Sequence, residues 1–368
     1  MRHIVILVDQ LHCVGGIERL VVLKANYWVD VFNYKVTIIS TEQLQKPFAY
    51  HLSNKIKFID LDIDFDRSSS YFKIKNLFKF FKNVKRLKTK LEYLKPDFII
   101  VASHIPITYY INFLKGKAKT IKEFHFTKWN SKENFKSKIE SYFLNMYDFL
   151  VVLSEEEENF YTTNNTVVLP NPLIEEMKFL TECKKKEVEK QNKAIFLGRI
   201  APVKNIESLI EIWSKFVMKY PDWILEIYGD YNNDYGNELI NEVVSRQLEN
   251  SIFFKGETKK TFEVISQSKI MLLTSHQECF PLVILESLAQ GVPVFSYDCP
   301  TGPRNILTDD FEGRIIENKN TDHFVRALDE FVKNELIQNR YSKNALLTAK
   351  KYCLPNVMEL WNNKIFNK

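Results

Sequence analysis

The chain has 368 residues, with 45% hydrophobic and 26% charged side chains, which is typical of globular proteins. This composition argues against wholesale disorder, collagen-like repeats and coiled coils. No apolar run approaches the roughly 20 residues that span a bilayer, and Ile4–Val8 is too short for a signal peptide. At about 100–200 residues per domain, the length predicts two domains.

The cysteines and the charge indicate where the protein works and what kind of ligand it meets. Five cysteines are widely spaced with no C-x-x-C pair, so neither a disulfide scaffold nor a zinc site is expected, and a cytoplasmic location fits. The net charge of +5 is uneven. Residues 1–170 hold 25 Lys and Arg against 18 Asp and Glu, whereas residues 171–368 hold 26 against 28. The first half is therefore expected to meet a phosphate, a nucleic acid or an anionic membrane.

Residues 1–170 alternate short β-branched runs with amphipathic helical periods. The expected strands are His3–Val8, Lys35–Ser40, Ile56–Asp60, Phe98–Ala102, Thr120–Phe124, Phe149–Leu153 and Val167–Leu169. The expected helices are Glu18–Phe32, Phe72–Leu94, Pro106–Leu114 and Ser131–Met146. This alternation predicts a parallel sheet that is covered on both faces.

The pattern breaks in a charged segment, for which we expect a linker over 173–193, and then a second series begins. Its expected strands are Ala194–Gly198, Trp223–Tyr228, Ile252–Phe254, Ile270–Leu273 and Val292–Ser296. Its expected helices are Ile206–Val217, Asn237–Leu248, Phe262–Gln267, Pro281–Gln290 and Thr321–Asn334. The fold class is therefore α/β, with two Rossmann-like, doubly wound domains facing a cleft. Ligands bind such sheets at the carboxyl ends of the strands.

Gly15 and Gly16 follow the first strand and open a helix. Two glycines there allow a phosphate to approach the backbone at a helix N-terminus, although a simple tight turn explains them equally well. The third glycine of the dinucleotide fingerprint is absent. A nicotinamide-dependent oxidoreductase is therefore disfavoured.

The loop after the strand Ala194–Gly198 holds two cations, Arg199 and Lys204. Asn205 follows them as the expected N-cap of the next helix. Arg donates to phosphate in bidentate fashion and Lys acts as a point charge, so the pair would suit a diphosphate. The alternative is two solvated basic residues in a loop.

Two glutamates, Glu278 and Glu286, flank seven mostly apolar residues. Pro281 suits the first turn of a helix, which places Glu286 inside an apolar helical segment. A buried carboxylate needs a partner, and sugar or ribose hydroxyls can supply one. The alternative is a core helix in which Glu286 pairs with a structural arginine.

Two histidines, His104 and His125, follow strands at the carboxyl edge, and either could face the cleft. A separate run of alternating acids comprises Asp60, Asp62, Asp64 and Asp66. Arg67 stands where a calcium loop requires glycine, so we expect an acidic, solvent-facing edge and no metal site.

Residues 71–95 contain nine Lys and Arg and one acid, Glu92. The expected apolar stripe of this helix is Leu77, Phe81, Val84, Leu87, Leu91 and Leu94. The stripe predicts packing on the sheet. The cations, with Phe72, Phe78 and Phe80, also suit contact with an anionic membrane. Nucleic acid is not expected, because no reader module is visible.

Together these residues resemble glycosyltransferase family 4, which comprises retaining enzymes of the GT-B fold. The resemblance covers most of the chain and is strongest for enzymes that build bacterial capsule, lipopolysaccharide or lipid-linked glycans. It implies that Arg199 and Lys204 neutralise the donor diphosphate. It further implies that Glu286 binds the nucleotide ribose and that Glu278 holds hydroxyls of the transferred sugar.

The resemblance also assigns roles to shorter segments. It implies backbone donors to the nucleotide sugar at Phe280, Pro281, Leu282 and Val283, and a phosphate approach at Gly15 and Gly16. His125 matches the histidine that contacts the donor sugar near the reacting carbon. The last helix, about Pro355 to Phe366, is expected to cross back to the first domain. Asn305 departs from the pattern, because relatives often carry an acid there.

The resemblance therefore implies a retaining glycosyltransferase that moves a hexose or N-acetylhexosamine from a nucleotide sugar, with UDP preferred, to a saccharide or lipid-linked acceptor. Residues 1–172 with about 355–368 would form the acceptor side, and 194–354 would bind the donor. No metal or other cofactor is expected. The enzyme would lie in the cytoplasm, at the inner face of the membrane, held through residues 72–94. The alternative is a non-catalytic subunit of the same fold that binds a sugar nucleotide or a glycan.

Overall fold

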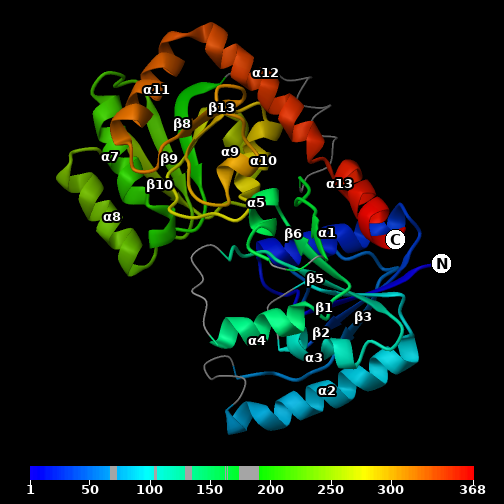
Figure 1. The fold of residues 1–368 in the computed structure, drawn as a ribbon. Coiled ribbons are helices and arrows are strands. Elements are labelled where there is room, and N and C mark those ends of the chain that lie inside the picture. The colour runs from blue at the N-terminus through cyan, green and yellow to red at the C-terminus, as the bar shows by residue number, and fades with distance from the viewer. Residues whose placement is uncertain (67–72, 103–105, 129–134, 162, 164, 174–189) are drawn as a thin grey trace. The chain divides into compact units, whose positions relative to one another are not determined.

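The computed structural model describes residues 1–66, 73–102, 106–128, 135–161, 163, 165–173 and 190–368 (Figure 1). The chain divides into two compact units, the first formed by Met1–Pro170 with Met358–Lys368 and the second by Asn171–Val357. Most of the segment expected to be a linker lies outside the described residues, and its last three residues belong to a strand that begins at Gln191.

The first unit contains a sheet of seven parallel strands in the order β3-β2-β1-β4-β5-β6-β7. The strands are β1 (His3–Val8), β2 (Lys35–Ser40), β3 (Lys57–Asp60), β4 (Phe98–Val101), β5 (Lys119–Glu123), β6 (Phe149–Val152) and β7 (Thr166–Val168). All six residues of β1 are buried, as expected for a central strand covered on both faces. The strand order reverses between β1 and β4, and such a switch point is where open α/β sheets bind ligands.

Helices cover both faces of this sheet. They are α1 (Gly16–Asp30), α2 (Ile74–Leu94), α3 (Ile107–Tyr110), α4 (Phe135–Leu144) and α5 (Glu155–Glu158). Figure 1 shows α1 on one face and α2, α3 and α4 on the opposite face. A buried apolar cluster joins Val5 and Leu7 of β1 to Leu87 and Leu91 of α2.

The second unit contains six parallel strands in the order β10-β9-β8-β11-β12-β13. The strands are β8 (Gln191–Leu197), β9 (Ile224–Tyr228), β10 (Ile252–Gly256), β11 (Ser268–Leu273), β12 (Val294–Tyr297) and β13 (Gly313–Ile316). Its helices are α7 (Ile206–Val217), α8 (Asp234–Ser245), α9 (Thr261–Ser266), α10 (Leu282–Ala289), α11 (Thr321–Lys333) and α12 (Glu335–Lys351). The order reverses between β8 and β11, which defines a second switch point.

The last helical segment returns to the first unit. It consists of α13 (Leu354–Trp361) and a π-helical turn, Asn362–Phe366. The ring centroid of Trp28 in α1 lies 5.6 Å from that of Trp361 and 5.4 Å from that of Phe366. The expected fold class, two doubly wound parallel sheets with a returning C-terminal helix, is therefore confirmed.

Two elements of the second unit, β13 and α12, have no counterpart in the sequence prediction. β13 spans only four residues, and α12 starts directly after α11 with no loop of turn-forming residues between them. Asn334 separates the two helices by capping α12, since its side chain accepts a hydrogen bond from the Ile337 N–H at 3.2 Å. The sequence pattern placed a helix end at Asn334 but gave no sign that a second helix begins at the next residue.

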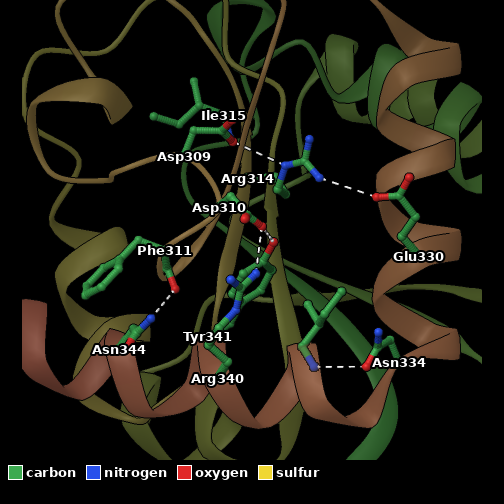
Figure 2. A network of polar contacts seen from close by, with 11 residues as sticks. Asp309, Asp310, Phe311, Arg314, Ile315, Glu330, Asn334, Arg340, Tyr341 and Asn344 are labelled. Atoms are coloured by element: carbon green, nitrogen blue, oxygen red, sulfur yellow. Dashed lines mark hydrogen bonds and ion pairs between the residues drawn. The ribbon is translucent and has the colours of Figure 1, made fainter.

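Figure 2 shows the polar network that attaches these elements to each other. Arg314 of β13 donates to Asp309 at 3.2 Å and to Glu330 of α11 at 3.4 Å. Asp310 accepts hydrogen bonds from Arg340 at 2.8 Å and from Tyr341 at 2.5 Å, both in α12. The network thus joins β13 to α11, and the loop before β13 to α12.

The predicted apolar stripe of α2 is wrong in its first half. Leu77 and Phe81 are 40% and 62% exposed, whereas Asn76 and Asn83 are fully buried. Asn76 exchanges two hydrogen bonds of 3.0 Å with the backbone of Asp66, which rotates the buried face by one residue. The prediction considered only apolar residues and therefore missed Asn76, whose side chain pairs with the backbone N–H and carbonyl of Asp66.

The rotation leaves an apolar surface on the first two turns of α2. We call Ile74, Leu77, Phe78 and Phe81 the outward face; Ile74 and Phe78 are both 78% exposed. Figure 1 shows α2 along the outer side of the first unit. No helix in the described part of the chain is long and apolar enough to cross a membrane.

Two of the four alternating acids lie at a solvent-facing edge as predicted, whereas Asp60 and Asp66 are half-buried. Asp62 and Asp64 are exposed, while the apolar residues that alternate with them, Leu61, Ile63 and Phe65, are buried. The loop after β3 therefore presents an acidic edge to solvent.

Candidate active site

An ion pair lies at the switch point of the second sheet. Lys204 ends the 3₁₀ turn Pro202–Lys204 after β8, and its Nζ is 2.6 Å from Oε1 of Glu278, in the loop after β11. The two side chains are 17% and 10% exposed. Because β8 and β11 are neighbouring parallel strands, their carboxyl ends bring these two residues together from distant parts of the sequence.

Glu278 is fixed from three sides. Ser275 Oγ donates to Oε1 at 2.7 Å, and Thr301 Oγ1 donates to the Glu278 carbonyl. Gly302 approaches so closely that a Cβ there would lie 2.4 Å from the Glu278 Cβ. Within the described residues, the Glu278 carboxylate is contacted at Oε1, by Lys204 and Ser275, so Oε2 is available to accept a hydroxyl.

The expected N-cap at Asn205 is wrong in its mechanism. Asn205 precedes α7 but adopts left-handed backbone angles, φ 51° and ψ 51°, and its side chain does not cap the helix. Its Nδ2 donates instead to the Thr274 carbonyl at 3.0 Å. Asn205 therefore ties the β8 loop to the end of β11, which helps to place Lys204 opposite Glu278.

Arg199 follows β8 directly and is exposed. It makes no hydrogen bond or ion pair with the residues that the structure describes. A guanidinium without a partner in the described part of the chain, at the same sheet edge as Lys204, is available to an anionic ligand.

The segment around Glu286 opens α10. Phe280 and Pro281 are buried, Leu282 and Val283 are half-buried, and Glu286 is 4% exposed inside the helix. The Pro281 carbonyl accepts from the Ile284 N–H at 3.0 Å. Leu282 and Val283 occupy the first two helical positions, whose amides lack intrahelical partners and can serve an anion.

In the first unit, His125 follows β5 and lies over a buried ion pair. Its Nε2 is 3.1 Å from Oε2 of Glu123, and Lys24 Nζ is 2.6 Å from both carboxylate oxygens of Glu123. Burial opposes the charge on Glu123, but Lys24 and His125 outweigh burial and lower the pKa of Glu123 to about 2. Burial is also the main reason that the pKa of His125 lies below its usual value.

The Gly15-Gly16 loop is placed as predicted, at the start of α1, with Gly15 at the N-cap position. The Glu18 carboxylate folds back over this loop, since a Cβ on Gly15 would lie 2.2 Å from Glu18 Oε2. A phosphate at these glycines would therefore have to displace a like charge. His104 lies outside the described residues.

The sequence reasoning missed several side chains that hold these sites. Lys24 lies in the apolar stretch VVLKANYWV of α1, and a lone cation in such a stretch is the signal of a buried partner. Ser275 and Gly302 gave no such signal. Among the described residues, no three His, Cys, Asp or Glu side chains are grouped so as to hold a metal ion.

Comparison of the sequence with known proteins finds relatives among the glycosyltransferases. Residues 180–347 match the family described as glycosyl transferases group 1. A poly(glycerol-phosphate) alpha-glucosyltransferase of Bacillus subtilis is 28% identical over 211 residues, which cover 57% of this chain and 30% of that protein. The chain thus spans less than a third of that relative. The amylovoran biosynthesis glycosyltransferase AmsD of Erwinia amylovora is 24% identical over 372 residues, 99% of both chains.

Solved structures agree on the fold over the whole chain. Staphylococcus aureus TarM, in complex with UDP, has a TM-score of 0.73 at 16% identity and covers 100% of both chains. A glycosyltransferase of Rickettsia africae has a TM-score of 0.76 at 18% identity, covering 100% of this chain and 99% of that one. The fold is therefore GT-B, and together the comparisons support a GT-B glycosyltransferase.

Proposed function

We propose that the chain is a retaining glycosyltransferase that moves a hexose or N-acetylhexosamine from a UDP-sugar to a saccharide acceptor. The observation that supports this most is the Lys204–Glu278 pair at the switch point of the second sheet, beside the exposed Arg199. Solved neighbours agree in ligand class, since Anabaena HepE binds UDP-glucose. The related AmsD acts in amylovoran biosynthesis, so the acceptor proposed here is part of a bacterial surface polysaccharide or glycolipid.

The donor has an anionic end and a hydroxyl-rich end, and the proposed site has a group for each. Arg199 and the amino group of Lys204 bind the diphosphate, with help from the amides of Leu282 and Val283. Lys204 has three N–H donors, so it can bind phosphate and keep Glu278. Glu278 then accepts sugar hydroxyls through Oε2, Glu286 holds the ribose, and His125 contacts the transferred sugar.

The chemistry depends on the leaving group. When the bond from the anomeric carbon to the diphosphate breaks, negative charge grows on the phosphate oxygen, and fixed cations and amides stabilise it. These groups would replace a bound metal ion, so we propose a metal-independent reaction. The acceptor hydroxyl attacks from the face that the diphosphate leaves and passes its proton to the departing phosphate, which retains the configuration. Glu278 and Glu286 are therefore not the acid and base of a hydrolase.

We further propose that α2 holds the protein at the inner face of an anionic membrane. The outward face of α2 exposes two phenylalanines, Phe78 at 78% and Phe81 at 62%. Lys75, Lys82 and Lys85 of the same helix are exposed as well. Basic helices with an exposed apolar face bind the boundary between headgroups and acyl chains. The acceptor would then be lipid-linked.

A donor screen tests the proposed reaction. The protein is incubated with UDP-, GDP- and ADP-linked hexoses and N-acetylhexosamines, with and without candidate acceptors. Release of the nucleoside diphosphate is measured, and the anomeric configuration of the product is read by proton NMR. We expect UDP release, lost in Lys204→Ala, with retained configuration. Binding of a UDP-sugar without release of UDP under any condition would instead identify a non-catalytic binding subunit.

A further inference from the structure

A pair of opposite charges is buried beneath His125. The side chains of Lys24 and Glu123 are 5% and 2% exposed. The Trp361 ring lies 4.7 Å from Lys24 Nζ and adds a cation–π contact from the end of the chain. Either charge would be costly to bury alone, so each depends on the other.

Glu123 determines which nitrogen of His125 carries the proton. With its pKa lowered to about 2, Glu123 is a carboxylate and can only accept hydrogen bonds. His125 Nε2, at 3.1 Å from Oε2, must therefore be the protonated nitrogen. In the neutral ring, Nδ1 is then an acceptor.

The surroundings of His125 keep the ring neutral. Burial lowers the pKa of His125 most, and Lys24 and Lys122 lower it further, against the opposing effect of Glu123. The other charged groups at this site are Lys128 and Glu140, which line the same cavity. A cation at His125 would add to the positive charges of Lys24, Lys122 and Lys128. The carboxylates that act on these lysines are Glu123, Asp9, Glu140 and Glu157.

His125 Nδ1 is buried and has no hydrogen-bond partner among the described residues. The ring lines a cavity of about 90 Å³, together with Ile17, Lys128, Glu140 and Tyr161. At roughly 30 Å³ per water molecule, a hydroxymethyl group would fit this space. A buried acceptor is costly to leave without a donor, and a hydroxyl in this cavity can supply one.

We propose that Lys24 and Glu123 are positioning residues that hold His125 as a neutral acceptor, and that a sugar hydroxyl enters the cavity and donates to Nδ1. This inference rests on the proposed function, because His125 must meet a sugar. It excludes His125 as a proton donor to the leaving group and as a cation that binds phosphate.

The tautomer of His125 tests the inference without any assay of activity. Long-range proton–nitrogen correlation NMR on protein labelled with ¹⁵N-histidine reports which nitrogen is protonated, and His125→Gln assigns the signal. We expect a proton on Nε2 alone at pH 7.5. A proton on Nδ1, or on both nitrogens, would overturn the inference while leaving the transferase proposal intact.

A paired variant tests the positioning role. Lys24→Met with Glu123→Gln removes both charges together, and the glutamine can either donate to His125 or accept from it. We expect the Nδ1-protonated form to appear and the KM for the donor to rise about five- to tenfold, as for one lost hydrogen bond. The melting temperature shows whether the variant is folded.

A second buried ion pair provides the control. Lys193 and Glu226 lie 3.1 Å apart in the second unit, with side chains 3% and 12% exposed. Lys193→Met with Glu226→Gln should leave the His125 tautomer and the KM unchanged. If the paired variant at Lys24 and Glu123 is folded and also keeps the wild-type tautomer and KM, these residues have only a structural role.

Discussion

Lys204 and Glu278 are 74 residues apart in the chain and 2.6 Å apart in space, at the point where the strand order of the second sheet reverses. The pair is charge-balanced by itself, so a diphosphate that binds Lys204 adds negative charge. Arg199, exposed at the same edge, supplies a further cation for this charge. The site is thus arranged for an anionic ligand that also carries hydroxyls for Glu278.

Loss of either cation should slow the reaction more than it changes the fold. Arg199→Ala and Lys204→Ala are each expected to lower turnover by about 10²-fold or more, because a contact to developing charge is lost. Circular dichroism should barely change, since Arg199 lies in a loop and Lys204 ends a short turn. Lys215→Ala, which removes an exposed lysine paired with Glu211 and Asp322, is the control. Normal turnover in both site variants would place the diphosphate elsewhere.

The two glutamates should differ in ligand preference. Glu286→Ala is expected to weaken binding of UDP and of the intact donor alike, because both contain the ribose. Glu278→Ala should weaken binding of the donor far more than that of UDP. Calorimetric titration of both variants with both ligands measures this, and equal losses everywhere would contradict the assignment.

Gly302 should affect donor binding by fixing the position of Glu278. A methyl group at Gly302 would lie 2.4 Å from the Glu278 Cβ, so Gly302→Ala must displace Glu278 or its loop. We expect weaker binding of the donor with little change for UDP, a smaller version of the effect of Glu278→Ala. Gly116→Ala is the comparison for backbone strain away from Glu278, because φ at Gly116 is +59° while a methyl group there meets nothing within 4 Å. Equal donor affinity in Gly302→Ala and wild type would show that Glu278 has no fixed position.

The ion pair under His125 should be stable only as a pair. Glu123→Gln leaves Lys24 buried without its counter-charge and should cost about 3–5 kcal/mol, much of which the paired Lys24→Met/Glu123→Gln variant recovers. The folded-state pKa of Glu123 is about 2 against 4.5 for a free glutamate, so its stabilisation is present above pH 4.5. It is lost as the pH falls towards 2. Thermal unfolding at pH 7 and pH 3 should therefore show the difference between wild type and Glu123→Gln shrinking in acid.

Membrane contact should depend on the outward face of α2. Phe78→Ser with Phe81→Ser changes two exposed side chains and should leave stability unaltered, yet reduce co-sedimentation with anionic vesicles. Leu336→Ser with Leu347→Ser, on exposed positions of α12, is the matched control. Binding should also weaken with salt, as the Debye length falls from about 10 Å at 0.1 M to about 3 Å at 1 M. If wild type ignores anionic vesicles at low salt, α2 only covers the sheet and a soluble acceptor is favoured.

Periodicity in the sequence indicated where most helices and strands lie, because alternating buried strands and amphipathic helices have distinct spacings. It could not determine which face of α2 is buried. That face depends on Asn76, a polar side chain that bonds to the backbone of Asp66, and no apolar pattern contains this information. β13 was missed for a different reason, since its four residues, Gly313–Ile316, are too few to show a period.

The candidate site was accessible from sequence only in part. Lys204 and Glu278 each follow a strand, and parallel strands bring such loops to one edge, so their proximity could be expected. The residues that hold Lys204 and Glu278 in place could not be predicted from the sequence. The close approach of Gly302 and the left-handed turn at Asn205 depend on the three-dimensional path of loops, and the Lys24–Glu123 pair depends on how α1 packs on β5.

The central claim is that the switch point of the second sheet binds the diphosphate of a nucleotide sugar. Its most direct test is a tryptophan-fluorescence titration of wild type and Lys204→Ala with UDP and with NAD. We expect saturable binding of UDP to wild type, binding at least about tenfold weaker in Lys204→Ala, and no response to NAD. Binding of NAD without binding of any nucleoside diphosphate would contradict the claim.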